Sequence, residues 1–209
     1  MAYSSYQAFR DDVLLRLDGE NSNQSISTAT MDALIEDAEE RIYYDGEAPL
    51  RVSTMEAALN LPVTSNAVTL PADFLELKEA YFSGYPPLEV VPLQRIREIE
   101  SYTPSGGIAR YAAHDGLTLR FYPLAGGNLL GTYYKRHQPL KTGVWANQTT
   151  FARYPKLFLY AALAEAAIFL GDAQMGEVYA NKFNEKLSAA NRHDRWQVYN
   201  GGPLRMRAR

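Results

Sequence analysis

The sequence contains no cysteine, so it can form neither disulfide bonds nor thiolate metal sites. Its only histidines are His114, His137 and His193, and no two of them have the spacing of a helical zinc motif. No stretch approaches the roughly 18 apolar residues of a membrane span, because Glu165 interrupts the longest run, LFLYAALAEAAIFL. The stretch MAYSSYQAFRDD does not have the pattern of a signal peptide. We expect a protein of a reducing cytosol, without membrane contact, metal or cofactor.

Catalytic motifs are also missing. The glycine-rich stretch PSGGIA lacks the Lys and Ser/Thr of a phosphate-binding loop, and no GxSxG motif occurs. Acidic pairs such as Glu98 and Glu100 suit glycosidic acid/base chemistry, but a chain with 24 acidic residues offers many such pairs by chance. The sequence therefore predicts a protein that is not an enzyme.

Charge is distributed unevenly along the chain. The formal net charge is −3, which argues against general nucleic-acid binding. Five of the 21 basic residues lie between Arg192 and Arg209 with a single Asp, so the rest of the chain carries 16 basic and 23 acidic residues. An acidic body with a basic end requires a functional explanation.

Helical periodicity is confined to the two ends of the chain. Residues 5–17 have apolar positions at helical spacing, and a second helix begins near Ser27 or Thr28. The acidic residues of that second helix are expected to form a solvated face. Two more helices are expected over 155–170 and 173–198, joined by Gly171-Asp172 as an antiparallel pair. The predicted buried positions of the last three helices are Met31, Leu34, Ile35, Ala38, Ile42; Leu157, Tyr160, Ala161, Ala164, Ile168; and Met175, Val178, Tyr179, Phe183, Leu187, Ala190.

The middle of the chain has strand patterns. MEAALNLPV, AVTLP and residues 75–82 read as strands, a short strand is expected at 88–91, and a helix opens near Pro92. Two further strands meet at His114-Asp115-Gly116, since Asp-Gly between alternating runs is typical of a hairpin. Another strand follows Gly126-Gly127. Because the links look too short for crossover helices, the region is predicted to be antiparallel.

This order of elements predicts an α+β fold. Four helices that cannot bury their apolar stripes singly would form a four-helix bundle-like lobe from both chain ends, with an antiparallel β lobe inserted. The expected boundaries are 1–50 and 150–200 for the helical lobe, 51–149 for the β lobe, and 201–209 for a C-terminal arm.

Aromatic residues are moderately abundant, with 15 Tyr and 8 Phe. Many are adjacent in strand patterns, as in Tyr81-Phe82, Phe121-Tyr122 and Tyr133-Tyr134, so one of each pair should face the core and the other the surface. An aromatic surface suits a subunit interface. It also suits sugars, so a glycan-binding or glycan-hydrolysing protein is an alternative.

Four stretches carry a resemblance to a known family: IEDAEERIYYD, LPADFLELKEAYFSGYPPLEVVP, LTLRFYPLAGGNLLGTYYKRHQPL and YPKLFLYAALAEAAIFLGDAQMGEVYANKFNEKLSAAN. Together they lie between about residues 28 and 192. In this layout the chain resembles the head–tail adaptor (portal adaptor, or neck) proteins of short-tailed bacteriophages.

The resemblance implies a structural virion protein, assembled in the cytoplasm of a bacterial host. A homododecameric ring would bind the portal protein, prolong the DNA channel and dock the tail or nozzle protein. Genomic DNA would pass without sequence-specific binding, which suits an acidic body, since basic walls would bind phosphates. A tail-completion protein that does not contact the portal is a further alternative.

The end of the chain supplies the predicted portal contacts. The last helix outruns its partner, and its overhang carries Trp196 and Tyr199, residue types that often anchor interfaces. After Gly201-Gly202-Pro203, the arm alternates apolar and cationic residues with strand periodicity. An isolated strand needs a sheet edge, which favours β-augmentation on the portal; a flexible basic tail and contact with channel DNA are the alternatives. The predicted portal-binding residues are Trp196, Tyr199, Leu204, Arg205, Met206, Arg207 and Arg209.

Overall fold

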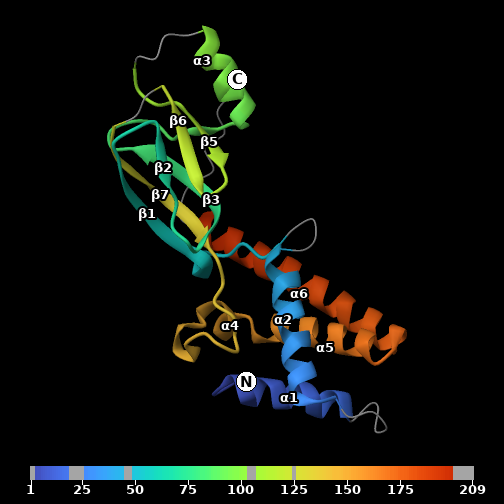
Figure 1. The fold of residues 1–209 in the computed structure, drawn as a ribbon. Coiled ribbons are helices and arrows are strands. Elements are labelled where there is room, and N and C mark those ends of the chain that lie inside the picture. The colour runs from blue at the N-terminus through green and yellow to red at the C-terminus, as the bar shows by residue number, and fades with distance from the viewer. Residues whose placement is uncertain (1–2, 19–25, 45–48, 103–106, 124–125, 200–209) are drawn as a thin grey trace. The chain divides into compact units, whose positions relative to one another are not determined.

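The computed structural model describes residues 3–18, 26–44, 49–102, 107–123 and 126–199, with the side chains of 18 and 196–199 excepted. The fold is α+β, as predicted: six helices and two β-sheets occur among these residues (Figure 1). The chain forms two compact units, one from Met1–Thr54 and Gln138–Arg209 and the other from Met55–His137.

The helical unit is organised around one central helix, α5 (Pro155–Phe169). It is contacted by α1 (Tyr6–Asp18), α2 (Thr28–Tyr44), α4 (Thr149–Arg153) and α6 (Ala173–Tyr199). Figure 1 shows α6 running alongside α5 and α2 crossing it. A helix surrounded in this way must be apolar on most of its faces.

Burial along α5 confirms this arrangement and corrects part of the sequence prediction. Nine of its residues between Leu157 and Ala167 are buried, so apolar contact extends around the helix instead of along one stripe. Ile168, predicted to be core, is 56% exposed, although it lies beside Gly176 of α6. Val178 on α6 is also largely exposed, whereas Tyr179 and Phe183 are buried as predicted.

Local signals in the sequence define the helix ends. Ser27 Oγ accepts a hydrogen bond from the Thr30 amide at 3.1 Å, which caps α2 as predicted. Gly171 has a φ of +77° in the turn between α5 and α6, a conformation that disfavours other residues. Asp172 Oδ1 then accepts from the Met175 amide at 3.0 Å and caps α6.

The segment before α5 contains the short helix α4. Phe151 of α4 is buried among aromatic rings, with centroid distances of 5.1 Å to Phe9, 5.0 Å to Trp145 and 5.2 Å to Phe158. The periodicity of so short a helix is not visible in sequence, so tertiary packing determines it.

The acidic residues of α2 differ in environment, which corrects the prediction of one solvated face. Glu36 is exposed, but Glu39 is 6% exposed and accepts hydrogen bonds from the Leu140 amide at 3.1 and 3.3 Å. Asp32 accepts from Tyr6 and pairs with two cations. Two of these carboxylates therefore have structural roles within the unit.

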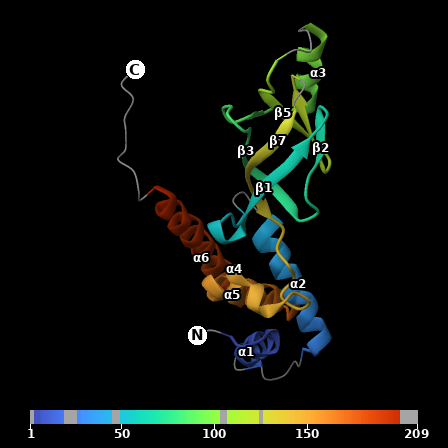
Figure 2. The same cartoon turned by 90° about the vertical axis from the view of Figure 1, so that its left-hand side faces the viewer.

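The second unit contains two sheets. In one, β7 (Gly127–Lys135) lies between β1 (Glu56–Val63) and β3 (Phe74–Phe82), and both pairings are antiparallel (Figure 2). The other has the order β2 (Ala67–Thr69), β6 (Thr118–Tyr122), β5 (Tyr111–Asp115), β4 (Glu89–Val90). The adjacent strands β1 and β2 therefore belong to different sheets.

One strand pair is parallel, so the wholly antiparallel prediction is wrong at this point. β4 pairs with β5 in parallel, while β5 and β6 are antiparallel. The link between β4 and β5 contains α3 (Leu93–Tyr102), which packs on β5 and β6. The predicted helix near Pro92 thus serves as the crossover that a parallel pair needs.

The core of the β unit combines residues of both sheets. Leu59, Phe82 and Leu129 from one sheet join Leu119 and Phe121 from the other. Adjacent aromatics were expected to divide between core and surface, but Phe121 and Tyr122 are both buried. They point to opposite faces of β6, and the second face is covered by Ile96 of α3.

The predicted hairpin at His114-Asp115-Gly116 is present, with its turn shifted by two residues. Asp115 pairs with Thr118, so Gly116 and Leu117 form the turn, and Gly116 has a φ of +62°. His114 lies in β5 instead of the turn, and its ring centroid is 5.6 Å from that of Phe74. Gly126 is exposed before β7, and Ala125 lies outside the described residues.

Candidate functional site

The predicted portal-binding residues lie at the end of the chain, where the described structure stops. Helix α6 continues to Tyr199, so Trp196 and Tyr199 have helical backbones; their side chains lie outside the description. Leu204, Arg205, Met206, Arg207 and Arg209 also lie outside the described residues.

The last described turns of α6 are fixed to the segment 49–53. Asn191 Nδ2 donates to the Pro49 carbonyl at 3.3 Å, and its Oδ1 accepts from the Arg51 amide at 3.1 Å. Asp194 is buried and accepts from the Ser53 amide at 2.9 Å and from the Ser53 hydroxyl at 2.6 Å. The long helix thus holds a defined position just before Trp196.

The structure provides no support for metal chemistry in the part it describes. Among the described residues, no group of three or more His, Asp or Glu side chains could hold a metal ion. His114 is next to Phe74, and burial lowers the pKa of its imidazole. His193 is exposed on α6.

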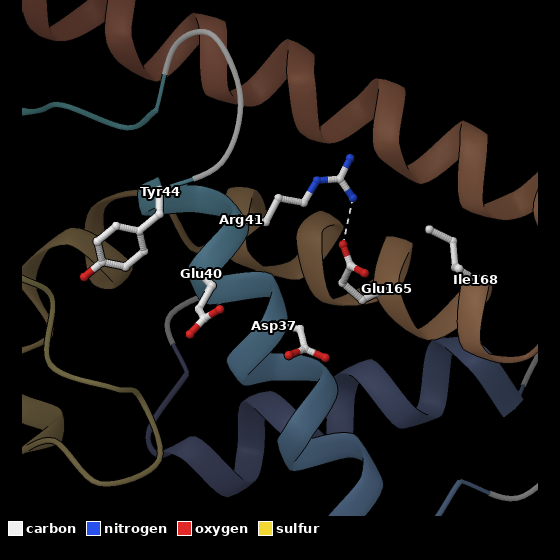
Figure 3. A pocket seen from close by; sticks show the side chains of 6 residues that line it. All are labelled: Asp37, Glu40, Arg41, Tyr44, Glu165 and Ile168. Carbon is white, nitrogen blue, oxygen red and sulfur yellow. Dashed lines mark hydrogen bonds and ion pairs between the residues drawn. The ribbon is translucent and has the colours of Figure 1, made fainter.

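The helical unit has a groove with a volume of about 490 Å³. Figure 3 shows Asp37, Glu40, Arg41 and Tyr44 on α2, and Glu165 and Ile168 on α5. The α2 residues occur at the i, i+3, i+4, i+7 spacing of one helix face, so a regular helix places all four along one wall.

The groove is acidic because Arg41, the only cation among the described residues that line it, is already paired. Arg41 Nη1 lies 2.8 Å from Glu165 Oε1, and the Arg41 guanidinium is 5.2 Å from the centre of the Phe183 ring. Asp37 and Glu40 are exposed and form no ion pair with a described residue. The groove lining therefore presents two uncompensated carboxylates, Asp37 and Glu40, in addition to the internal Arg41–Glu165 ion pair.

Sequence reasoning did not identify this groove. One signal was available: Glu165 interrupts an otherwise apolar helix, and a charge in such a helix needs a partner. Its partner, Arg41, is 124 positions away in the chain, and only the crossing of α2 and α5 brings them together.

Several tyrosines serve internal packing in the described structure. Tyr133 donates to Asp73 Oδ1 at 2.9 Å, and burial together with this hydrogen bond raises the pKa of its hydroxyl to about 12. Tyr6 donates to Asp32 at 2.7 Å, and Tyr43 is buried. These three residues are unavailable to form a sugar-binding platform.

The comparisons with known proteins identify a family for this chain. No helix in the described ranges is long and apolar enough to cross a bilayer. No curated protein matches the chain significantly. A family model described as SU10 adaptor protein matches residues 4–207, and this confirms the resemblance to phage head–tail adaptors and indicates a structural role in a virion. The chain belongs to the SU10 adaptor protein family.

Proposed function

We propose that this chain is the subunit of a homododecameric ring that joins the phage portal to the tail, assembled in the bacterial cytoplasm. The observation that carries the proposal is the family match over residues 4–207, which includes both compact units and most of the arm. The ring would bind the portal protein, extend the DNA channel and dock the tail or nozzle protein.

The charge distribution supports a channel role. Outside residues 192–209 the chain has an excess of acidic over basic residues. Acidic walls repel the phosphate backbone, so DNA would slide past them, whereas clustered Lys and Arg would bind it in a salt-dependent way. DNA would therefore pass without sequence-specific binding.

The end of the chain is the proposed portal contact. Asn191 and Asp194 hold α6 on the 49–53 segment, which gives the following residues a fixed base. Trp196 and Tyr199 would fill pockets on the portal. The arm would add a strand to a portal sheet edge, with Leu204 and Met206 buried and Arg205, Arg207 and Arg209 paired with acidic groups.

Deletion of Pro203–Arg209 tests the arm. The truncated chain should remain folded, because the described helices end at Tyr199, but it should fail to saturate purified portal in co-sedimentation. Saturated rings are recognised by mass, since twelve chains of 23.4 kDa give about 280 kDa. Unchanged affinity would show that the arm is not the anchor. Loss of affinity only at low salt and with DNA present would instead favour a DNA contact.

Trp196→Ala tests the helical part of the same contact. It should weaken portal binding by about 2 kcal/mol, the usual size of an aromatic hot spot, with far-UV circular dichroism unchanged. Asn184→Ala, twelve residues earlier and exposed, is the control for loss of a side chain on this helix. An unfolded Trp196 variant would place that side chain in the core instead.

The β unit is proposed to face the tail. Its exposed turns, Gly116-Leu117 and the residues at Gly126, are positions where loops carry binding function on a rigid sheet. A short insertion at Gly126 should leave portal co-sedimentation unchanged and reduce tail attachment in a particle-assembly assay. If the insertion abolishes portal binding instead, the β unit contacts the portal, and the proposed portal and tail contacts are reversed.

A further inference from the structure

Charge in the helical unit is separated toward opposite ends of the α5–α6 pair. The groove carboxylates Asp37, Glu40 and Glu165 lie toward the Gly171 turn, because Glu165 is near the end of α5. The exposed cations Lys156 and Arg192 lie away from that turn, one at the start of α5 and the other late in α6. An antiparallel helix pair places such positions at opposite ends.

The exposed cations at the end of the α5–α6 pair away from the Gly171 turn are uncompensated, like the groove carboxylates. Lys156, Arg192 and Arg195 are exposed and form no ion pair with a described residue. Most other cations of this unit are engaged: Arg10 and Lys141 pair with Asp32, Arg16 with Asp12, and Lys186 with Glu185. We call Lys156, Arg192 and Arg195 the basic end.

Exposed apolar side chains accompany the groove. Ile168 in its lining and the adjacent Phe169 are 56% and 58% exposed, and Tyr44 on the opposite wall is 49% exposed. Large apolar groups beside unpaired charges are typical of a surface that another protein covers. DNA is a poor occupant, because the carboxylates would repel its phosphates.

We propose that the groove is a subunit interface that receives the basic end of an adjacent copy of this chain. This inference rests on the ring proposed above and identifies the contacting surfaces. Arg192 and Arg195 of one copy would approach Asp37 and Glu40 of the next, while Ile168 and Phe169 are covered. The chain itself supplies the charge complementarity, so no other partner is needed.

The two surfaces are different patches of one chain, so the contact is heterologous. A repeated heterologous contact closes into a ring when its rotation divides a full turn, whereas an isologous contact stops at a dimer. The charged pairs would mainly fix the orientation of neighbouring copies and the rate of association. The Arg41–Glu165 pair stays internal and keeps the two walls of the groove in register.

Intermolecular disulfides test the contact directly, because the natural chain has no cysteine. Full-length Glu40→Cys and Arg192→Cys chains are mixed under mild oxidation, and the 40–192 cross-link is identified by peptide mass. It should form at least about tenfold faster than the 40–184 cross-link of a Glu40→Cys and Asn184→Cys mixture, because contact raises the effective concentration. Asn184 is exposed on the same helix. High salt should reduce this difference.

Charge reversal provides the second measurement. Asp37→Lys with Glu40→Lys should abolish self-association in sedimentation, as should Arg192→Glu with Arg195→Glu. All four substitutions in one chain, or an equimolar mixture of the two double variants, should restore it. Circular dichroism checks that each variant folds. Folding is expected, because all four substituted positions are exposed.

Both measurements are made with the free chain and with purified portal added. Equal 40–192 and 40–184 rates in both conditions, with no rescue by reversal, overturn the inference. If the chains still saturate the portal, the proposed function stands and only the interface is wrong. If the 40–192 cross-link forms but no portal binding occurs, the interface stands and the portal role fails.

Discussion

At the scale of single residues, Asp32 connects three segments of the helical unit. It accepts from the Tyr6 hydroxyl of α1 at 2.7 Å, lies 3.5 Å from Arg10 of α1, and lies 3.2 Å from Lys141 before α4. Burial alone would raise the pKa of its carboxyl, but the hydrogen bonds from Tyr6 and Lys141 and the charges of Lys141 and Arg10 outweigh burial and lower it. The charged form is therefore the one that stabilises the fold.

Replacing Asp32 with Asn should lower the free energy of unfolding at pH 7 by about 2 kcal/mol, as expected for hydrogen bonds to a charged group. Because the folded pKa is depressed, the contribution of Asp32 is present above its ordinary value of 3.8 and is lost as the pH falls below it. Urea unfolding should thus show a large difference from wild type at pH 7 and a small one near pH 2. Glu36→Gln, exposed on the same helix, is the control and should be neutral at both. A pH-independent difference would mean that shape, not charge, is what matters at position 32.

At the scale of elements, α5 depends on small side chains. Ala161, Ala162, Ala164, Ala166 and Ala167 are all buried, so neighbouring helices approach this helix closely. A Cβ added at Gly176 of α6 would lie 3.1 Å from the Ile168 side chain. The packing of α5 thus leaves little volume for larger residues.

Ala161→Leu should destabilise the unit by about 2 kcal/mol through overpacking. Ala189→Leu, an equal change at an exposed position of α6, should alter the melting temperature by little. Thermal unfolding followed by circular dichroism compares the two variants. Equal effects would indicate that α5 has free volume beside Ala161 and is less tightly enclosed than its burial implies.

At the scale of the whole molecule, the β unit is inserted into the helical unit through two adjacent strands. Glu56 at the start of β1 pairs with Tyr134 near the end of β7, so the chain enters and leaves the β unit at neighbouring positions, about 5 Å apart. Because the two ends of the inserted β unit are adjacent, the helical unit can carry the insertion without a change in its own fold.

We expect the helical unit to fold without the β unit. Replacing residues 55–137 with a short Gly/Ser linker should give a soluble, cooperatively melting protein with the helix content of the five helices outside the β unit. The fragment 55–137, with its own core between two sheets, is the complementary sample. A shortened chain that aggregates would show that the helical unit depends on the β unit for stability.

Much of the secondary structure could be predicted from the sequence, because it depends on local periodicity. The apolar spacing from Met31 to Ile42 predicted the buried face of α2 correctly, and all five predicted positions are buried. Ser27 and Gly171 predicted helix ends through caps and turns, which are properties of neighbouring residues. The membership of the adaptor family was likewise visible in the order of the elements.

The candidate groove, in contrast, could not be predicted from the sequence, and neither could the parallel β4–β5 pair. Arg41 and Glu165 are far apart in the chain and meet only because α2 crosses α5. Ile168 fits the buried stripe by spacing, yet it is exposed, because it lines the open groove beside α2. Spacing along a helix or strand determines which residues share a face. Whether that face meets another element or solvent depends on how distant segments pack, and only the tertiary structure decides this.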